Sequence, residues 1–324
     1  KFTCVTIGDL DAIGIRILLD LYKEKKIKNF ILFKNKKIIF KFFKKIKSSV
    51  KINIVNEHKN DFNYKKNKLN IFNFKADNKH LNTILSIKNS YIFCLKYKQK
   101  GIITLPVNKS KVKKNIKNFT GHTEFFEKLD NIKISNMIFI YNQLLISTLT
   151  THIAINKIYN KIRKKNYIYD KIITLNKSLI KDFNIKKPKI IISGLNPHAS
   201  ENNNIGNEEQ DIIIPQLKKL RKININIDGP ISGDALLVKK NLNKYNCFVY
   251  IFHDQALIPF KYISQFQGIN YTSNLKMIRL SPDHGTGYEL IKNKKYSCKS
   301  VLNCFKYINK IYKNKLNWKQ QKNR

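Results

Sequence analysis

Short apolar runs rich in β-branched residues alternate along this chain with longer, lysine-rich segments of helical length. The apolar runs predict strands, at Phe2–Ile7, Ile31–Phe33, Ile102–Leu105, Lys189–Ser193 and Phe248–Phe252. The longer segments predict helices, at Ile13–Lys25, Ile155–Lys165, Ile172–Phe183, Asp211–Lys222 and Ser300–Lys313. This alternation is typical of an α/β protein with a largely parallel sheet. The pattern between residues 34 and 97 assigns no element.

Polar clusters follow directly on several of the apolar runs. They read "VTIGD", "ITLPVNK", "TLTTH", "IIISGLNPH" and "VYIFHDQ". In open α/β sheets, ligands bind in the crevice beyond the carboxyl ends of the strands. We therefore expect these clusters to form one catalytic rim.

The length of 324 residues is sufficient for two ordinary domains, each with its own core. Hydrophobic residues make up 42% of the chain and aromatic residues 11%, which argues against wholesale disorder. The protein is therefore expected to be globular.

The formal net charge of +42 would ordinarily indicate a nucleic-acid or membrane-surface partner. Only five basic residues are arginines, however, and the lysines are spread through the whole chain rather than grouped. Lysines exposed to solvent over the whole surface explain this pattern better than a basic patch for nucleic acid does. Nucleic acid is therefore not the expected partner. The charge should still draw anionic ligands such as phosphates toward clefts.

The five cysteines contain no Cys-x-x-Cys pair, and an odd number of them fits free thiols in a reducing compartment. Lysines interrupt every apolar stretch that could otherwise cross a bilayer. The first residues read as a strand and not as a signal peptide. These features predict a soluble, cytoplasmic protein.

Three histidines share one setting, because His152, His198 and His253 each stand at or just after the end of an apolar run. Each alone could be a packed or surface residue. Together, three imidazoles could hold Zn²⁺ or a similar divalent ion and leave one coordination position open for substrate. No local spacing such as His-x-x-x-His decides between these interpretations.

Two further segments could contact a ligand. "GHTEFFEKL" places His122 and Thr123 at a helix start, which suits either ordinary N-capping or a bound phosphate or carboxylate. "SPDHGTGYEL" is a compact turn whose glycines would let a ligand approach the backbone. Neither G-x-G-x-x-G nor G-x-x-x-x-G-K-[ST] is present, so a standard Rossmann site or P-loop is disfavoured.

Taken in order, the motifs of this chain resemble those of the 4-hydroxythreonine-4-phosphate dehydrogenase (PdxA) family. They are "TLPVNK", "GHTEFF", "TTHIAI", "SGLNPHASENNNIGNEE", "IIPQL", "GPISGDAL", "FHDQALIPFKY", "GINYT" and "IRLSPDHGTGYEL". The family's N-terminal "GDPAGIGPE"-like segment reads "GDLDAIGIR" here, and Gly287 stands where alanine is usual.

The resemblance implies a homodimer of the isocitrate and isopropylmalate dehydrogenase type. Each subunit would have two α/β/α domains, with the active site in the cleft between them and near the dimer interface. The first domain would comprise residues 1–118 plus 252–324, with both termini and the cofactor loop. The second, residues 119–251, would carry the metal ligands and the dimer contact.

The resemblance also implies roles for individual residues. By position, His152, His198 and His253 match the family's metal ligands. The matches to substrate-binding positions are His122, Thr123, Asp234, Asp254, Lys261, Asn270 and Arg279. The matches to the loop that holds the cofactor's adenosine are His284, Gly285 and Thr286.

The implied reaction belongs to vitamin B6 biosynthesis. NAD, possibly NADP, with one divalent metal (Zn, Mg, Co or Mn), would oxidise 4-phosphooxy-L-threonine to 2-amino-3-oxo-4-phosphooxybutanoate. That β-keto acid would then lose CO₂ and give 3-amino-2-oxopropyl phosphate. One alternative is a sister dehydrogenase for phospho-threonate or phospho-erythronate. Another is a basic nucleic-acid-binding protein on a decayed dehydrogenase scaffold.

Overall fold

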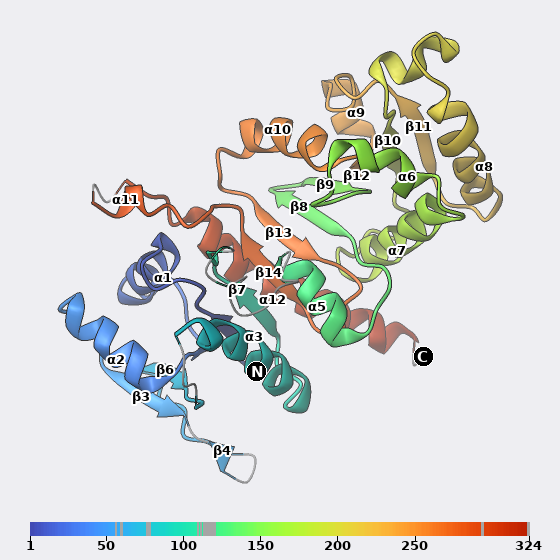
Figure 1. The fold of residues 1–324 in the computed structure, drawn as a ribbon. Coiled ribbons are helices and arrows are strands. Elements are labelled where there is room, and N and C mark those ends of the chain that lie inside the picture. Colours follow the sequence, from blue (N-terminus) through green and yellow to red (C-terminus); the bar gives the residue numbers. More distant parts are fainter. Residues whose placement is uncertain are drawn as a thin grey trace. The chain divides into compact units, whose positions relative to one another are not determined.

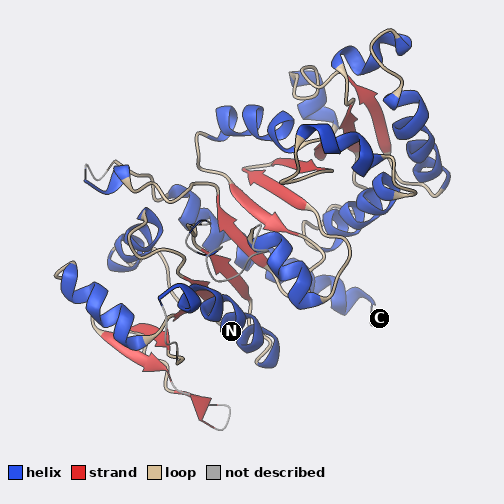
Figure 2. Cartoon of the chain, in the orientation of Figure 1, coloured by secondary structure: helices blue, strands red, loops and turns tan. Residues whose placement is uncertain are grey.

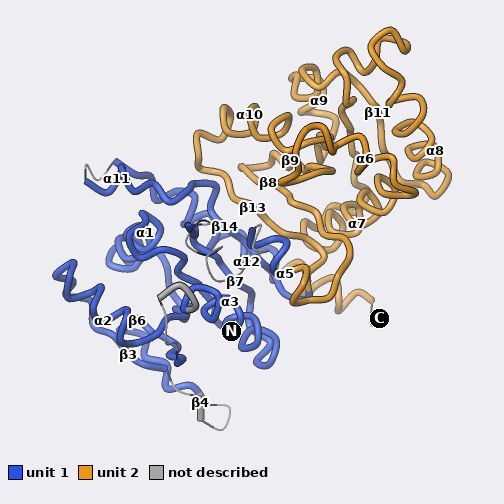
Figure 3. Tube along the Cα trace, viewed as in Figure 1, with its two compact units in different colours: residues 1–126, 276–312 blue, residues 127–275, 313–324 orange. Residues whose placement is uncertain are grey.

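The chain forms two compact units in the computed structural model (Figure 3). The structure describes residues 1–55, 57–58, 61–75, 79–108, 110, 112, 121–292 and 295–322. Unit 1 comprises residues 1–126 and 276–312, and unit 2 comprises residues 127–275 and 313–324. The predicted boundary at residues 118–119 lies outside the described residues. The predicted functional domains therefore stay a proposal.

Unit 1 is built on a parallel sheet with the strand order β14-β7-β1-β2-β6-β3 (Figure 1). The strands are β1 (Thr3–Thr6), β2 (Phe30–Phe33), β3 (Ile52–Val55), β6 (Leu69–Phe72), β7 (Gly101–Thr104) and β14 (Arg279–Pro282). Strands β1, β2 and β7 are buried along their whole length. Continuous burial is expected where helices cover both faces of a parallel sheet.

The helices of unit 1 follow the strands in βα order. They are α1 (Ile13–Lys23), α2 (Lys36–Lys45), α3 (Lys79–Lys96), α5 (His122–Asp130, which begins in this unit), α11 (Glu289–Lys292) and α12 (Lys299–Lys322, which also begins in this unit). Helix α3 packs against β1, β2 and β7. The Asn35 side chain caps α2 by accepting a hydrogen bond of 3.0 Å from the Lys37 N–H. A short hairpin of β4 (Glu57–His58) and β5 (Asp61–Phe62) is separate from the sheet.

Unit 2 has a mixed sheet with the strand order β11-β10-β12-β9-β8-β13. The strands are β8 (Met137–Tyr141), β9 (Leu144–Thr148), β10 (Ile190–Ser193), β11 (Ile227–Ile231), β12 (Cys247–Tyr250) and β13 (Ile269–Thr272). Strand β8 is antiparallel to both β9 and β13, and the remaining pairs are parallel. Phe139, Ile146, Phe248 and Phe260 belong to its buried core.

The helical elements of unit 2 surround this sheet (Figure 2). They are η1 (Ile155–Lys157), α6 (Ile158–Ile162), α7 (Tyr167–Lys181), η2 (Pro197–Asn203), η3 (Glu209–Ile213), α8 (Ile214–Lys222), α9 (Lys239–Lys244) and α10 (His253–Ser264). Helix α10 packs against β9 and β12, and α8 packs against β11.

The predicted α/β class is confirmed, and each predicted strand is present within two residues of its expected ends. Three predicted helices differ in length. At Ile155–Lys165 a 3-10 turn precedes a helix that ends at Ile162. Helix α7 begins at Tyr167 rather than Ile172, and α12 continues to Lys322 rather than ending at Lys313. The five cysteines are free thiols, and all but Cys298 are buried. In the part of the chain that the structure describes, no helix is both long and apolar enough to cross a membrane.

Candidate active site

A cavity of about 570 Å³ lies at the carboxyl ends of parallel strands in unit 2. Its lining includes Asn196 and His198, which follow β10, and Asp254 and Gln255, which follow β12. Asp234 follows β11 and lines the same cavity. Parallel neighbours end at the same edge of a sheet, so the fold itself gathers these side chains. Two of the polar clusters singled out in the sequence, "GLNPH" and "FHDQ", thus meet at one cavity.

Two of the three candidate metal ligands lie side by side. His253 is the first residue of α10, and the centroid of its ring is 5.5 Å from that of His152. The His253 Nδ1 atom is 2.6 Å from the Asp254 Oδ1 atom. This contact favours the tautomer in which Nδ1 carries the proton and Nε2 presents its lone pair. His198 is exposed and stands on the left-handed turn of η2, with a φ of 52°.

The residue types fit a divalent cation, but their arrangement does not form a complete set. Three imidazoles are suitable donors for zinc and similar ions. Among the residues that the structure describes, however, no three His, Cys, Asp or Glu side chains lie close enough together to hold one ion. A metal centre at these histidines is therefore a proposal based on donor chemistry and on the adjacency of two rings.

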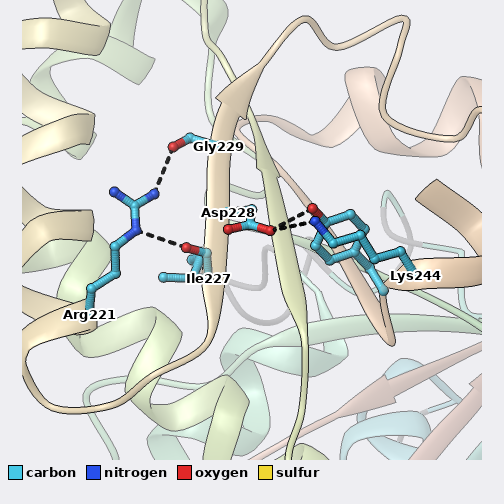
Figure 4. A network of polar contacts seen from close by, with 6 residues as sticks. Arg221, Ile227, Asp228, Gly229 and Lys244 are labelled. Carbon is cyan, nitrogen blue, oxygen red and sulfur yellow. Dashed lines mark hydrogen bonds and ion pairs between the residues drawn. The ribbon is translucent and has the colours of Figure 1, made fainter. Parts of the chain in front are cut away.

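The carboxylate of Asp234 is held at the cavity wall by its own loop. The Ser232 hydroxyl donates a hydrogen bond to it, and this bond is the first cause of the lowered pKa of Asp234. The preceding strand is braced from two sides (Figure 4). Arg221 donates to the carbonyl oxygens of Ile227 and Gly229, each at 2.9 Å.

Asp228 completes that brace on the other side of β11. Its carboxylate accepts hydrogen bonds from the Tyr245 hydroxyl at 2.6 Å and from Lys244 Nζ at 3.2 Å. The Tyr245 bond is the first cause of the lowered pKa of Asp228. The network therefore fixes β11, which positions the loop that carries Asp234.

Glu209 is a buried residue of the candidate site that the sequence analysis did not assign. Only 1% of it is exposed. Its Oε1 atom accepts hydrogen bonds from the backbone N–H groups of Leu195 at 2.7 Å and Asn196 at 2.9 Å. Its Oε2 atom accepts from Asn196 Nδ2 at 3.0 Å and from the Ser200 hydroxyl. One buried carboxylate thus holds both ends of the turn that carries His198.

Gln255 makes a similar link on the other side of the cavity. Its Oε1 atom accepts hydrogen bonds from the Ile251 N–H at 3.0 Å and from the Ser193 hydroxyl at 3.2 Å. Its Nε2 atom donates to the Gly194 carbonyl at 3.1 Å. The side chain therefore joins the ends of β10 and β12 beneath the cavity. The sequence could have indicated both residues, because Glu209 lies in the motif "GNEE" and Gln255 lies in the motif "HDQ".

The predicted substrate residues His122, Thr123 and Arg279 belong to unit 1. Helix α5 begins at His122, as the sequence predicted. Arg279, on β14, is 2% exposed, and it donates to the Thr104 hydroxyl from Nη2 at 2.7 Å and from Nε at 3.1 Å. A third contact of 3.4 Å runs from Nη1 to the Thr123 hydroxyl. Burial lowers the pKa of Arg279 to about 10, against the effect of Glu124, so the guanidinium is charged at neutral pH.

Two other predicted substrate residues belong to unit 2. Lys261 lies on α10, and its Nζ atom is 4.9 Å from the centroid of the Phe266 ring. Asn270 lies on β13, where its Oδ1 atom is buried without a hydrogen-bond partner among the described residues. A buried amide oxygen without a donor favours the approach of a ligand donor.

The predicted cofactor loop, also in unit 1, is compact. The Thr286 carbonyl accepts a hydrogen bond of 2.9 Å from the N–H of Ile13, at the start of α1. His284 places Nδ1 2.9 Å from the Gly285 carbonyl oxygen and leaves Nε2 buried with no partner in the described residues. Burial also lowers the pKa of His284. The space around Gly285 is open, so the loop has both an unused polar atom and room for a ligand.

The backbone conformation and the packing at position 287 explain why a glycine stands there. Its φ is +51°, and a Cβ atom there would lie 2.8 Å from Cδ1 of Ile13. Tyr288, next to it, donates to Asp9 Oδ2 at 2.7 Å and accepts from Asn108 Nδ2 at 3.0 Å. Glycine therefore lets this loop close onto the segments that follow β1 and β7.

Known proteins resemble the chain along most of its length. The family profile described as "Pyridoxal phosphate biosynthetic protein PdxA" matches residues 26–308. A 4-hydroxythreonine-4-phosphate dehydrogenase of Sulfurihydrogenibium sp. (strain YO3AOP1) is 33% identical over 297 residues, which cover 88% of this chain and 90% of that relative. A protein of the same name from Prosthecochloris aestuarii is 28% identical, with 98% of each chain covered.

Solved structures share the fold. A 4-hydroxythreonine-4-phosphate dehydrogenase from Klebsiella pneumoniae superimposes with a TM-score of 0.80. The match covers 96% of this chain and 99% of the other, at 22% sequence identity. At that identity the likeness concerns the fold alone.

Proposed function

The chain belongs to the PdxA family of pyridoxal phosphate biosynthetic proteins, and from this membership we propose that it oxidises 4-phosphooxy-L-threonine with NAD⁺. The single observation that carries the proposal is the family match across residues 26–308. The enzyme is then an oxidoreductase of vitamin B6 biosynthesis that acts on a small phosphorylated substrate. Its product, a β-keto acid, loses CO₂ and gives 3-amino-2-oxopropyl phosphate.

The side chains available suit an anionic substrate. Lys261, and Arg279 with the neighbouring pair His122 and Thr123, are the groups we propose to bind the phosphate and the carboxylate. Arg279 cannot be replaced by lysine without loss, because its planar guanidinium bonds Thr104 and Thr123 together. Asn270 offers its buried amide oxygen to a substrate donor. These residues would bind and orient the substrate.

We propose that His284, Gly285 and Thr286 hold the adenosine end of the cofactor. The buried Nε2 atom of His284 and the open space at Gly285 support this placement. When bound, NAD⁺ supplies the hydride acceptor for the oxidation.

We propose that His152, His198 and His253 bind one divalent cation, either Zn, Mg, Co or Mn. Such an ion supplies Lewis-acid polarisation of a substrate oxygen. Asp254 orients His253 through the 2.6 Å contact at Nδ1, and Glu209 holds the turn of His198. The ligand set must close further around an ion, because the described residues do not already enclose one.

We also propose a cytoplasmic homodimer with the active site near the dimer interface, as the family resemblance implies. The mass of the protein in solution, measured by light scattering, tests the dimer directly. A monomer with full activity would contradict it.

Turnover by the purified full-length protein tests the proposed reaction. NADH formation would be followed with 4-phosphooxy-L-threonine, phospho-threonate and phospho-erythronate in parallel, with and without chelator. We expect turnover with the first substrate, loss on chelation and recovery with a divalent metal. Absence of turnover with that substrate at every metal supplement would overturn the proposal.

Two variants sharpen that test. We expect Asp254→Asn to lower kcat/KM by at least about tenfold, because it removes the group that orients a candidate ligand. Asp211 is exposed on η3 and does not line the cavity, so it provides the matched control Asp211→Asn. His198→Ala should abolish metal retention. Unchanged metal content in that variant would show that the ligand assignment is wrong.

A further inference from the structure

A second cavity lies at the carboxyl ends of β1, β2 and β7 in unit 1, and no role proposed above uses it. It has a volume of about 480 Å³, and its lining includes Gly8, Lys34, Ile38, Lys41, Phe42 and Asn108. Gly8, Lys34 and Asn108 come from the segments that directly follow the three parallel strands. This edge of an open α/β sheet is where ligands usually bind.

Lys34 is the unusual member of this lining. Only 3% of the residue is exposed, although lysine is rarely buried unless its charge is paired. Its backbone N–H bonds the Phe72 carbonyl at 3.2 Å, whereas its side chain makes no hydrogen bond or ion pair with any residue that the structure describes. A buried ammonium group without such a partner is energetically unfavourable in a folded protein. Its position on a cavity wall therefore requires an explanation.

The acidic residues of the cavity are already engaged by other groups. Asp9 accepts hydrogen bonds from the Tyr288 hydroxyl at 2.7 Å and from the Asp11 N–H at 3.0 Å. Asp11 forms an ion pair of 3.3 Å with Lys45. Asp9 attracts Lys34 electrostatically but makes no hydrogen bond with it. The two carboxylates therefore leave the ammonium without a dedicated counterion.

Further positive charge surrounds the same space. Lys41 lines the cavity from α2. The Arg16 guanidinium lies 5.1 Å from the centroid of the Phe42 ring, and its Nε atom is buried without a hydrogen-bond partner in the described part of the chain. Cations thus exceed anions around the cavity.

We propose that this cavity binds a phosphate group, either free or carried by a small metabolite, with Lys34 as its principal cation. A cavity of this size can accept a phosphate together with an attached organic group. Burial lowers the pKa of Lys34 to about 8, against the effect of Asp9, so the amine is mostly protonated at neutral pH. A bound phosphate would supply the missing acceptor oxygens. This cavity is distinct from the unit 2 cavity that His198 lines.

Methyl NMR of isoleucine-labelled, full-length protein provides local reporters for both cavities. Ile38 lines the Lys34 cavity and Ile258 lines the unit 2 cavity that contains His198, so binding at either cavity gives a separate signal. The Ile38→Val and Ile258→Val variants assign these signals. Inorganic phosphate is titrated at constant ionic strength, with chloride as the balancing anion. We expect a saturable shift of the Ile38 methyl signal.

Charge variants decide whether Lys34 is responsible. In Lys34→Met, we expect the phosphate concentration at half-saturation of the Ile38 shift to rise at least about tenfold. Lys34→Arg should keep it near the wild-type value. Lys44→Met is the matched control, because Lys44 is an exposed lysine of α2 that does not line this cavity. The proposal is overturned if the Ile38 signal does not shift with phosphate. It is also overturned if the shift reaches half-saturation at the same phosphate concentration in Lys34→Met and in wild type.

Addition of NAD⁺ before phosphate identifies the source of the bound group. If NAD⁺ shifts Ile38 and then prevents the phosphate response, the cavity holds a phosphate of the cofactor. If the phosphate response persists with NAD⁺ present, the cavity is a separate anion site. Both outcomes support phosphate binding at Lys34, and neither depends on dehydrogenase turnover.

Discussion

Arg279 keeps its charge inside unit 1, where threonine hydroxyls accept hydrogen bonds from its guanidinium and Glu124 supports the charge. Its donors reach Thr104 twice and Thr123 once, and the residue is 2% exposed. A lysine at this position would present one ammonium group and could not bond both hydroxyls in the same plane. The residue therefore joins β14, β7 and the start of α5 through geometry as well as charge.

Arg279→Lys is expected to destabilise the protein by about 2 kcal/mol, because buried hydroxyls lose their donors. Urea unfolding measures this loss. Turnover with 4-phosphooxy-L-threonine should fall at least about tenfold in kcat/KM if the guanidinium also orients substrate. The exposed Arg163 provides the control Arg163→Lys, which should change neither quantity. Wild-type turnover in Arg279→Lys would remove this residue from the substrate site.

Lys34 predicts a pH dependence of stability. Burial lowers its pKa from the ordinary 10.5 to about 8 in the folded protein. Between these values the unfolded chain binds more protons than the folded one, so its contribution to the free energy of unfolding rises with pH. Below about pH 8 the full penalty of the buried charge is present.

In ligand-free protein, Lys34→Met should therefore be more stable than wild type at neutral pH. From about pH 7 to pH 9.5 the difference between the two proteins should shrink by roughly 2 kcal/mol. Urea unfolding of both proteins across that range measures it. A difference that stays constant with pH would show that Lys34 is not a strained buried cation.

At the scale of an element, the turn from Asn196 to Asn203 shows how the chain presents His198. Every residue from His198 to Asn203 has a positive φ, between 44° and 75°. Such a run is unfavourable for residues with a Cβ atom, although asparagine tolerates it better than most. The hydrogen bonds to Glu209 hold the turn in place.

Glu209→Gln should cost about 2 kcal/mol of stability, because an amide cannot accept all the hydrogen bonds that the carboxylate accepts. We also expect metal affinity to fall about tenfold or more, as the turn of His198 loosens. Calorimetric metal titration and urea unfolding test both effects. Glu208→Gln is the control, since Glu208 accepts one hydrogen bond from the described residues, from Asn196 Nδ2 at 2.7 Å. Equal effects of the two variants would contradict a special role for Glu209.

Glu201→Gly tests the left-handed conformation itself. Glu201 is exposed and has a φ of 44°, so glycine removes a steric penalty there. The net gain should be roughly 0.5 kcal/mol after the extra entropy of glycine in the unfolded chain. Asp211→Gly, at an exposed position of η3, should instead destabilise by a similar amount. Thermal unfolding of the two variants should shift in opposite directions.

At the scale of the whole molecule, the formal net charge of +42 means that the positive side chains of the folded protein repel one another. Self-repulsion of this kind destabilises a compact state and weakens as salt screens it. The same charge should attract anions to both cavities. Stability and substrate affinity should therefore respond to salt in opposite directions.

We expect Tm to rise by a few degrees when NaCl increases from about 0.05 M to about 0.5 M. Over the same range, KM for the anionic substrate should increase severalfold. Differential scanning calorimetry and initial rates measure the two effects. A Tm that falls with salt would show that attractive ion pairs outweigh the repulsion.

Local pattern was sufficient for the α/β class and for the main strands and helices. It missed β8 and β9, although two apolar runs flank Asn142, whose φ of 51° makes the tight turn between them. The elements between residues 34 and 97 were also missed, because Lys, Asn and Phe recur there without clear breaks. Propensity is weak where a biased composition blurs the turn signals.

The sequence by itself determined the family, because its motifs keep their order in a chain of lysine-rich composition. The same motifs identified the three candidate histidines. Only the tertiary structure decided which side chains meet. It placed His253 beside His152, set Glu209 beneath the turn of His198, and buried Lys34 in a cavity of its own. Strand order and parallel pairing bring distant segments to one sheet edge, and no spacing along the chain encodes those distances.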